Sequence, residues 1–242
     1  KTRTLFSLLN SLDKERKNIV SLEDPIEYTF KGINQIEIKE PLSFASALRA
    51  ILRQDPDIIF VGEIRDFETA DLCFKASATG HLVISTLHAN SSSKVIERLR
   101  NMGIEKYMIE SNLRFSAAQR LVKQICPNCS IKACIEDIKK YSLNEEGNYL
   151  TRNKKGCSKC TNGVIGRMPV MEYLTKYELV DYKMLKPKRT LQDECIFKAE
   201  QGLILVYLMN CVGKIYNPKI PISTEWYYEL ATIGLEQIWT KE

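Results

Sequence analysis

Short apolar segments that alternate with amphipathic segments place the strongest limit on the fold of this chain. Ile58 to Val61 is a continuous apolar run flanked by acidic residues, which is typical of a strand buried on both faces. His81 to Leu87 has the same character, and Asn18 to Leu22 is a short β-prone run. Because strands and helical patterns alternate along the chain, the sequence predicts an α/β fold with a mostly parallel sheet.

Apolar residues at helical spacing predict the intervening helices. The expected helices cover residues 2–13, 43–54, 67–79, 91–102 and about 105–124. Ser43 is suited to cap the second of them, and Gly80 and Gly103 are suited to end the third and fourth. Residues 26–30 and 33–38 are expected to be extended and joined as a hairpin at Lys31-Gly32.

Composition excludes several classes of protein. The 242 residues suggest one or two domains, and 44% hydrophobic residues are enough for a sizeable core. A net charge of +5 is well short of the profile of a nucleic-acid-binding protein. The longest apolar stretch, residues 202–212, is far below the ~20 residues of a membrane span, and no signal peptide opens the chain.

Polar residues follow each predicted strand. Glu23 and Asp24 come after the first strand, Glu63 after the second and His88 after the third. Functional residues of a parallel sheet lie at the carboxyl ends of its strands, so this arrangement predicts a site. Glu63 is placed like the acid of a Walker B segment, which holds Mg²⁺ or orients an attacking water. A histidine in the place of His88 is suited to hydrogen-bond a phosphate oxygen.

Each of these features has a structural alternative. The acidic segments 21–28 and 58–66 are also compatible with solvated turns, although carboxylates that crowd together favour a cation as partner. For His81 a purely structural role is the better interpretation. Arginines suit phosphate, but most arginines form ordinary surface ion pairs; the candidates are Arg49, Arg53, Arg65, Arg98, Arg114 and Arg120.

Two C-x-x-C pairs predict a metal site. Cys126 with Cys129 and Cys157 with Cys160 supply four thiolates, which suit a closed, tetrahedral, structural zinc site. A redox dithiol is the alternative, but neither pair opens a helix after a thioredoxin-like strand.

In combination, these segments resemble the secretion ATPases that drive type II secretion and type IV pilus assembly. SLEDPIEY (21–28) resembles the family's aspartate box, and LRAILRQDPDIIFVGEIRD (48–66) its Walker B region. GHLVISTLHAN (80–90) resembles its histidine box. QRLVKQICPNC (119–129) and GCSKC (156–160) resemble its tetracysteine loop. The similarity covers roughly residues 1–170.

The resemblance implies ATP, Mg²⁺ and Zn²⁺ as cofactors and assigns roles to individual residues. Lys1 and Thr2 fall where the phosphate loop ends, so Lys1 would contact the β- and γ-phosphates and Thr2 would bind Mg²⁺. Glu23 and Glu63 would share activation of water, and His88 would sense the γ-phosphate. Arg65 is a further candidate for nucleotide binding.

The resemblance also implies a domain organisation and partners. We expect a RecA-like P-loop NTPase core over residues 1–125, a zinc-binding loop over 126–160 and a divergent, mainly helical segment over 161–242. Family members work as homo-hexamers in the cytoplasm, peripheral to the inner membrane, and act on a membrane platform protein without nucleic acid. The tetracysteine loop argues against the pilus-retraction branch.

The chain begins with Lys1 inside the expected phosphate loop, which indicates a fragment without the glycines of that loop. The alternative to a motor ATPase is therefore a non-catalytic, zinc-stabilised assembly module or a degenerate gene fragment of the same family.

Overall fold

The computed structural model describes residues 2–140, 143, 146–147, 149–176, 179, 187, 189–204 and 228–233. The chain forms two compact units. The first comprises Lys1–Ala118, Tyr173–Pro187 and Tyr228–Glu242, and the second comprises Gln119–Glu172 and Lys188–Tyr227. The expected end of the core at residue 125 therefore falls inside the second unit.

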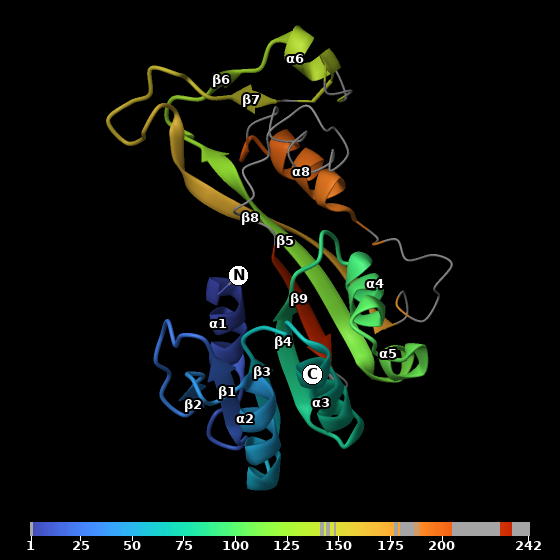
Figure 1. Ribbon diagram of the computed structural model, residues 1–242. Helices are drawn as coiled ribbons and strands as arrows, with labels where there is room; N and C mark the ends of the chain where they lie inside the picture. Colours follow the sequence, from blue (N-terminus) through green and yellow to red (C-terminus); the bar gives the residue numbers. More distant parts are fainter. Residues whose placement is uncertain are drawn as a thin grey trace. The chain divides into compact units, whose positions relative to one another are not determined.

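The first unit contains the alternating strands and helices that the sequence predicts (Figure 1). Its elements are α1 (Thr2–Ser11), β1 (Ile19–Glu23), β2 (Asn34–Glu37), α2 (Phe44–Ile51), η1 (Leu52–Gln54), β3 (Ile58–Val61), α3 (Phe67–Ala78), β4 (Leu82–Leu87), α4 (Lys94–Asn101), α5 (Lys106–Asn112), β9 (Tyr228–Ile233) and the first part of β5 (Leu113–Ile125). Ser43 caps α2 in a capping box, as expected.

The strands of this unit form a mostly parallel sheet. β2, β1, β3 and β4 are neighbours in that order and all run parallel, while β9 pairs antiparallel with β4. Leu22 lies opposite Val61, and Val61 lies opposite Ser85, so these strands end side by side. Residues that follow the strand ends are therefore brought to one edge.

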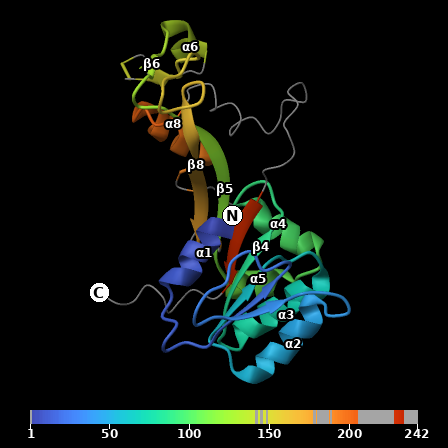
Figure 2. The same cartoon turned by 90° about the vertical axis from the view of Figure 1, so that its left-hand side faces the viewer.

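Helices cover both faces of the sheet. Figures 1 and 2 together show α1 on one side of the strands and α2 and α3 on the other. Val20, Ile59 and Val83 belong to a continuous apolar core with the helices α2 to α5. The alternate residues of these strands are buried as well, and Leu5 and Leu9 of α1 are 2% and 1% exposed. Burial on both faces explains why the strand sequences are continuously apolar.

Two local predictions are wrong. Residues 26–30 form no strand, and β2 pairs with β1 in parallel instead of closing a hairpin. The helix expected over 105–124 ends at Asn112, and β5 begins at Leu113. From Arg120 to Lys123 buried and exposed residues alternate, which is the period of a strand.

The second unit contains the cysteine pairs. Its elements are the remainder of β5, β6 (Ile131–Lys132), α6 (Ile135–Lys140), β7 (Leu150–Thr151), most of β8 (Val164–Thr175) and α8 (Leu191–Glu200). The strands β8 and β9 fall within residues 161–242, so the mainly helical expectation for that segment is wrong at 164–175 and 228–233. Every helix in the described parts of the chain is too short or too polar to cross a lipid bilayer.

Candidate functional site

The carboxyl edge of the parallel strands carries the predicted polar residues. Glu23 is the last residue of β1, Glu63 follows β3 by two residues and His88 directly follows β4. The expected gathering of acidic residues and histidine is therefore realised, because β1, β3 and β4 are adjacent and parallel.

Glu63 is contacted from both sides. His88 Nε2 lies 2.5 Å from Glu63 Oε1, and Arg65 Nε donates to Glu63 Oε2 at 2.6 Å. Arg65 also lies near Asp24, with Nη1 3.8 Å from Oδ2. The hydrogen bond to Glu63 and its charge raise the pKa of Arg65 above its ordinary value. The edge thus holds a carboxylate between a histidine and an arginine.

Gly62, which precedes Glu63, lies close against the backbone of β1. The Gly62 amide donates to the Leu22 carbonyl at 2.8 Å, which holds β3 against β1. A Cβ at Gly62 would lie 3.0 Å from that carbonyl oxygen and 3.5 Å from the Cα of Glu23. Any side chain at position 62 would bring its Cβ this close to β1, and the acid of this segment is the next residue, Glu63.

Glu23 lies beside Gly62 and is only 4% exposed. Ser21 Oγ and Gln35 Nε2 each donate to Glu23 Oε1 at 2.8 Å. The carboxylate is thereby held by two neutral donors, one from β1 itself and one from the neighbouring strand β2.

Hydroxyl groups hold the loop between Val61 and Asp66. Ser85 Oγ donates to the Val61 carbonyl at 2.8 Å, and Thr86 Oγ1 donates to the Gly62 carbonyl at 2.6 Å. Asp66 caps α3 by accepting from the Thr69 amide at 2.8 Å. These contacts fix the backbone on both sides of Glu63.

Sequence reasoning missed Ser21, Gln35 and Thr86. In the parallel pairing of β1 and β2, Ser21 lies opposite Gln35, so both side chains reach the end of β1. The hairpin prediction removed this signal, because it paired residues 33–38 with 26–30 and not with β1.

The remaining candidates are placed as follows. Lys1 lies outside the described residues, and Thr2 is the first residue of α1. His81 Nδ1 lies 2.9 Å from the Ala76 carbonyl and 3.1 Å from Thr79 Oγ1, which agrees with the structural interpretation of this histidine. Arg49 forms an ion pair with Glu68 on α3.

The second unit brings the four cysteines of the C-x-x-C pairs together. Their sulfur atoms all lie within 4.8 Å of one another, and the cysteines are free thiols. Cys126 Sγ is 3.8 Å from Cys157 Sγ, and Cys129 Sγ is 3.6 Å from Cys160 Sγ. A Zn–S bond of about 2.3 Å in tetrahedral geometry separates sulfurs by about 3.8 Å, so the cluster fits zinc.

The backbone around the cluster supports the thiolate form of these ligands. The Cys157 amide lies 3.2 Å from Cys160 Sγ, an N–H···S hydrogen bond. Burial raises the pKa of Cys126, but hydrogen bonds from the Asn128 backbone and from neighbouring thiols outweigh it and lower that pKa to about 7. Burial and the neighbouring thiols raise the pKa of Cys129 to about 12. The pKa values of Cys126 and Cys129 are thus displaced in opposite directions, as expected of closely spaced titrating groups.

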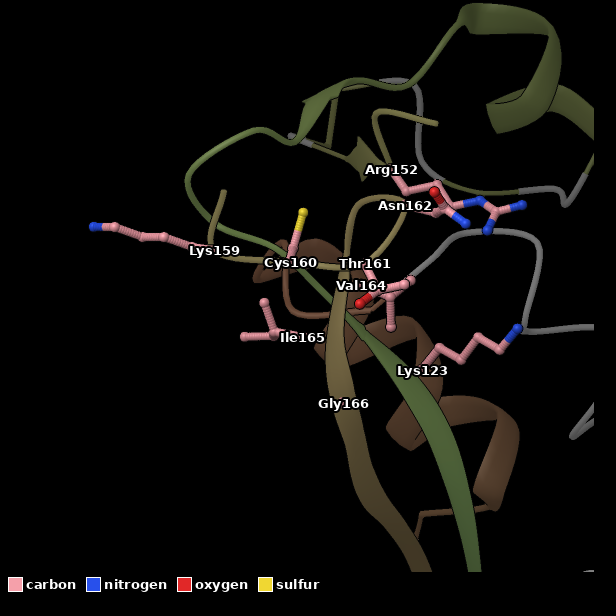
Figure 3. A pocket seen from close by; sticks show the side chains of 9 residues that line it. All are labelled: Lys123, Arg152, Lys159, Cys160, Thr161, Asn162, Val164, Ile165 and Gly166. Atoms are coloured by element: carbon pink, nitrogen blue, oxygen red, sulfur yellow. The ribbon is translucent and has the colours of Figure 1, made fainter. Parts of the chain in front are cut away.

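A pocket of about 540 Å³ adjoins the cluster at Cys160. Lys123, Arg152 and Lys159 are among its lining residues (Figure 3). Figure 3 shows Lys123 and Lys159 extending away from each other on opposite sides. The cationic groups therefore do not converge on one point.

Comparison with protein families and curated proteins gives consistent matches. Residues 1–198 match the family described as "Type II/IV secretion system protein". The type IV pilus assembly ATPase PilB of Myxococcus xanthus is 44% identical over 184 residues, which cover 72% of this chain and 32% of that protein. The type II secretion system ATPase E of Vibrio cholerae is 44% identical over 179 residues, covering 72% and 36%. The chain spans about a third of the length of these relatives.

Solved structures match as well. The pilus retraction motor PilT with bound ADP superposes with a TM-score of 0.64 at 27% identity, covering 90% of this chain and 59% of that chain. The ATPase DotB of Legionella pneumophila, at 20% identity, superposes with a TM-score of 0.61 over 88% of this chain and 56% of that chain, which shows a shared fold. The parallel sheet of the first unit therefore fits a RecA-like ATPase core.

Proposed function

The chain belongs to the type II/IV secretion system protein family, and on this basis we propose that it is the catalytic portion of an ATP-hydrolysing motor subunit. The motor powers type II protein secretion or type IV pilus assembly from the cytoplasmic face of the inner membrane. The names of relatives that are 44% identical, an assembly ATPase and a secretion ATPase, support both branches equally.

One observation carries the proposal. Glu63 lies between His88 and Arg65 at the carboxyl edge of a parallel sheet, and Glu23 lies on the adjacent strand. Ligands of open α/β sheets bind at this edge. A carboxylate that can orient water, with two neighbouring groups that suit phosphate oxygens, is compatible with phosphoryl transfer to water.

The roles of these residues follow from their chemistry. Glu63 and Glu23 orient and activate the attacking water, and their oxygens are the donor type that Mg²⁺ prefers. His88 and Arg65 contact Glu63 and are also suited to bind phosphate oxygens. A bound γ-phosphate would therefore compete with Glu63 for both side chains. Lys1 would bind the β- and γ-phosphates, and Thr2 would bind Mg²⁺. Mg²⁺ itself neutralises charge on the phosphates.

We assign the four-cysteine cluster to structural zinc. The sulfur separations of 3.8 Å between Cys126 and Cys157 and 3.6 Å between Cys129 and Cys160 fit tetrahedral thiolate coordination, and four protein ligands leave no open position for catalysis. The metal would join the segments that carry the two cysteine pairs.

The assembly and partners follow from the family. The subunit acts in a homo-hexamer, peripheral to the inner membrane, and transmits domain motion to a membrane platform protein. The retraction motor PilT shares the fold, so the fold itself does not select among these machines.

Steady-state ATP hydrolysis by the full-length gene product tests the function. Glu63→Gln keeps the size of the side chain and removes its charge, so we expect turnover to fall by a factor on the order of 10²–10⁴. Undiminished turnover in Glu63→Gln contradicts the assignment.

Glu68→Gln is the matched control. Glu68 lies on α3 in an exposed ion pair with Arg49, outside the carboxyl edge, and its replacement leaves turnover unchanged. Wild-type protein that binds zinc but hydrolyses no ATP would favour the non-catalytic assembly module.

A further inference from the structure

The carboxylate of Glu23 is hydrogen-bonded unevenly. Both of its donors, Ser21 Oγ and Gln35 Nε2, lie 2.8 Å from the same oxygen, Oε1. Within the described part of the chain no side chain or amide bonds to Oε2. Because the residue is 4% exposed, rotation of its side chain is restricted, and Oε2 is the carboxylate oxygen without a hydrogen bond from the described residues.

The direction of the Gln35 amide is itself determined. The Phe30 amide donates to Gln35 Oε1 at 2.7 Å, so the oxygen of this side chain faces Phe30. The Nε2 group must then face the other way, where it donates to Glu23 and to the Tyr28 carbonyl, the latter also at 2.8 Å. A flipped amide would place its oxygen against the Glu23 carboxylate and an N–H against the Phe30 N–H.

The sheet places Gln35 for this contact. β2 pairs with β1 in parallel, and Gln35 lies opposite Ser21. Ser21 precedes Glu23 by two residues on β1. Residues opposite each other in paired strands direct their side chains to the same face. Ser21 and Gln35 therefore reach Oε1 from two strands.

We propose that Gln35 is a positioning residue for ATP hydrolysis, which fixes the Glu23 carboxylate so that Oε2 is presented to the attacking water. This inference rests on the proposed function, in which Glu23 shares activation of that water. Misplacement of a reacting group by about 1 Å can cost a factor on the order of 10² in rate, so one neutral hydrogen bond can matter greatly here.

Steady-state kinetics of the full-length gene product test the inference. Gln35→Met keeps the length of the side chain but removes its amide. We expect kcat to fall about 10- to 100-fold with KM for ATP nearly unchanged, because the lost interaction acts on the reacting groups and not on nucleotide binding.

A second variant distinguishes the positioning of Glu23 from the stabilisation of the 25–33 loop through the hydrogen bond with the Phe30 amide. Gln35→Glu keeps an oxygen acceptor for the Phe30 amide but replaces the donor that faces Glu23 with an oxygen. We expect kcat to fall as far as in Gln35→Met. Asn34→Ala, at the preceding exposed residue of β2, is the control and keeps wild-type kcat.

A double-mutant cycle shows whether Gln35 acts through Glu23. If it does, Gln35→Met has no further effect on the residual rate of Glu23→Gln. Losses that multiply in the double variant, or full kcat in Gln35→Met or Gln35→Glu, overturn the inference. Thermal unfolding verifies that each variant is folded. If Gln35→Met does not fold, the kcat of Gln35→Glu alone tests the inference.

The controls separate this inference from the proposed function. If Glu23→Gln is inactive and Gln35→Met is fully active, the positioning role of Gln35 is rejected and the proposed function is not affected. If Glu23→Gln is fully active, the role of Glu23 in activating water is rejected, and the positioning role of Gln35 is rejected as well. Wild-type protein without ATP hydrolysis rejects the function itself.

Discussion

His88 Nε2 lies 2.5 Å from Glu63 Oε1, although the two residues follow different strands and are 25 positions apart in the sequence. The contact exists because β3 and β4 are adjacent and parallel, so the loops after them meet at one edge. It links the residue proposed to act on water to a residue proposed to sense phosphate.

Removal of this histidine tests the link. In His88→Ala, Glu63 loses a contact on Oε1, and we expect kcat for ATP to fall by a factor on the order of 10². The midpoint of thermal unfolding changes little, because the His88 side chain is half exposed. His81→Ala, which alters a contact with the end of α3, leaves kcat unchanged. Equal kcat in His88→Ala and wild type contradicts the prediction.

Gly62→Ala is expected to destabilise the fold. The added Cβ would lie 3.0 Å from the Leu22 carbonyl, which the Gly62 amide itself holds at 2.8 Å, so relief requires separating β1 from β3. Overpacking of this kind costs about 1–3 kcal/mol, measurable by urea denaturation.

The comparison variant is Gly80→Ala. Its Cβ would meet no atom within 4 Å, but its φ of +100° is unfavourable for alanine, so it loses stability without disturbing the edge. We expect ATP turnover to fall in Gly62→Ala and to persist in Gly80→Ala. Wild-type stability and turnover in Gly62→Ala would show that the two strands can separate freely.

Zinc content is expected to depend on the cluster. Purified protein should hold about one zinc per chain, because four thiolates complete one tetrahedral site. Cys157→Ser removes a ligand, so the metal is lost and the unit that contains the cluster is destabilised. Elemental analysis measures the metal. Cys134→Ser, at an exposed cysteine outside the cluster, retains it. A folded wild-type protein without metal contradicts the assignment.

Asp57 gives a prediction about stability and pH. A hydrogen bond from Lys17 at 2.9 Å and one from the Asn18 amide at 2.8 Å lower the pKa of Asp57 below 3.8. A carboxyl group with a lowered folded-state pKa contributes stability that is present above pH 3.8 and is lost as the pH falls through the folded-state value.

Asp57→Asn is therefore expected to lower the free energy of unfolding at pH 7 by at most about 1 kcal/mol, since the pair is solvent-exposed. The difference from wild type shrinks below pH 3.8. Urea denaturation of both proteins across this range measures it, and a difference that stays constant with pH argues against the ion pair as its source.

Local sequence patterns were sufficient for the central strands and for much of the edge site. β1, β3 and β4 are buried on both faces, so their apolar runs are visible without knowledge of their neighbours. Parallel order then places the residues after them at one edge, which is why the proximity of Glu63 and His88 was predictable. The spacing of the two C-x-x-C pairs likewise predicted the cluster that the fold assembles.

Local sequence patterns do not predict which strands pair with each other. Helical and extended periods overlap over residues 113–125, so the sequence predicts a helix where the structure has the strand β5. Local patterns predict that residues 33–38 pair with the nearest extended segment, whereas the structure pairs β2 with β1.

Residue types and their spacing are sufficient to predict the α/β class, the strand-end carboxylates and the four clustered thiols, because burial and residue chemistry act within short segments. The folded chain places Gln35 opposite Ser21, where it donates to Glu23, and it brings Arg65 and His88 against Glu63 from two sides. These contacts depend on which strands are neighbours. That choice is made by the packing of the whole sheet and its helices, which no single segment encodes.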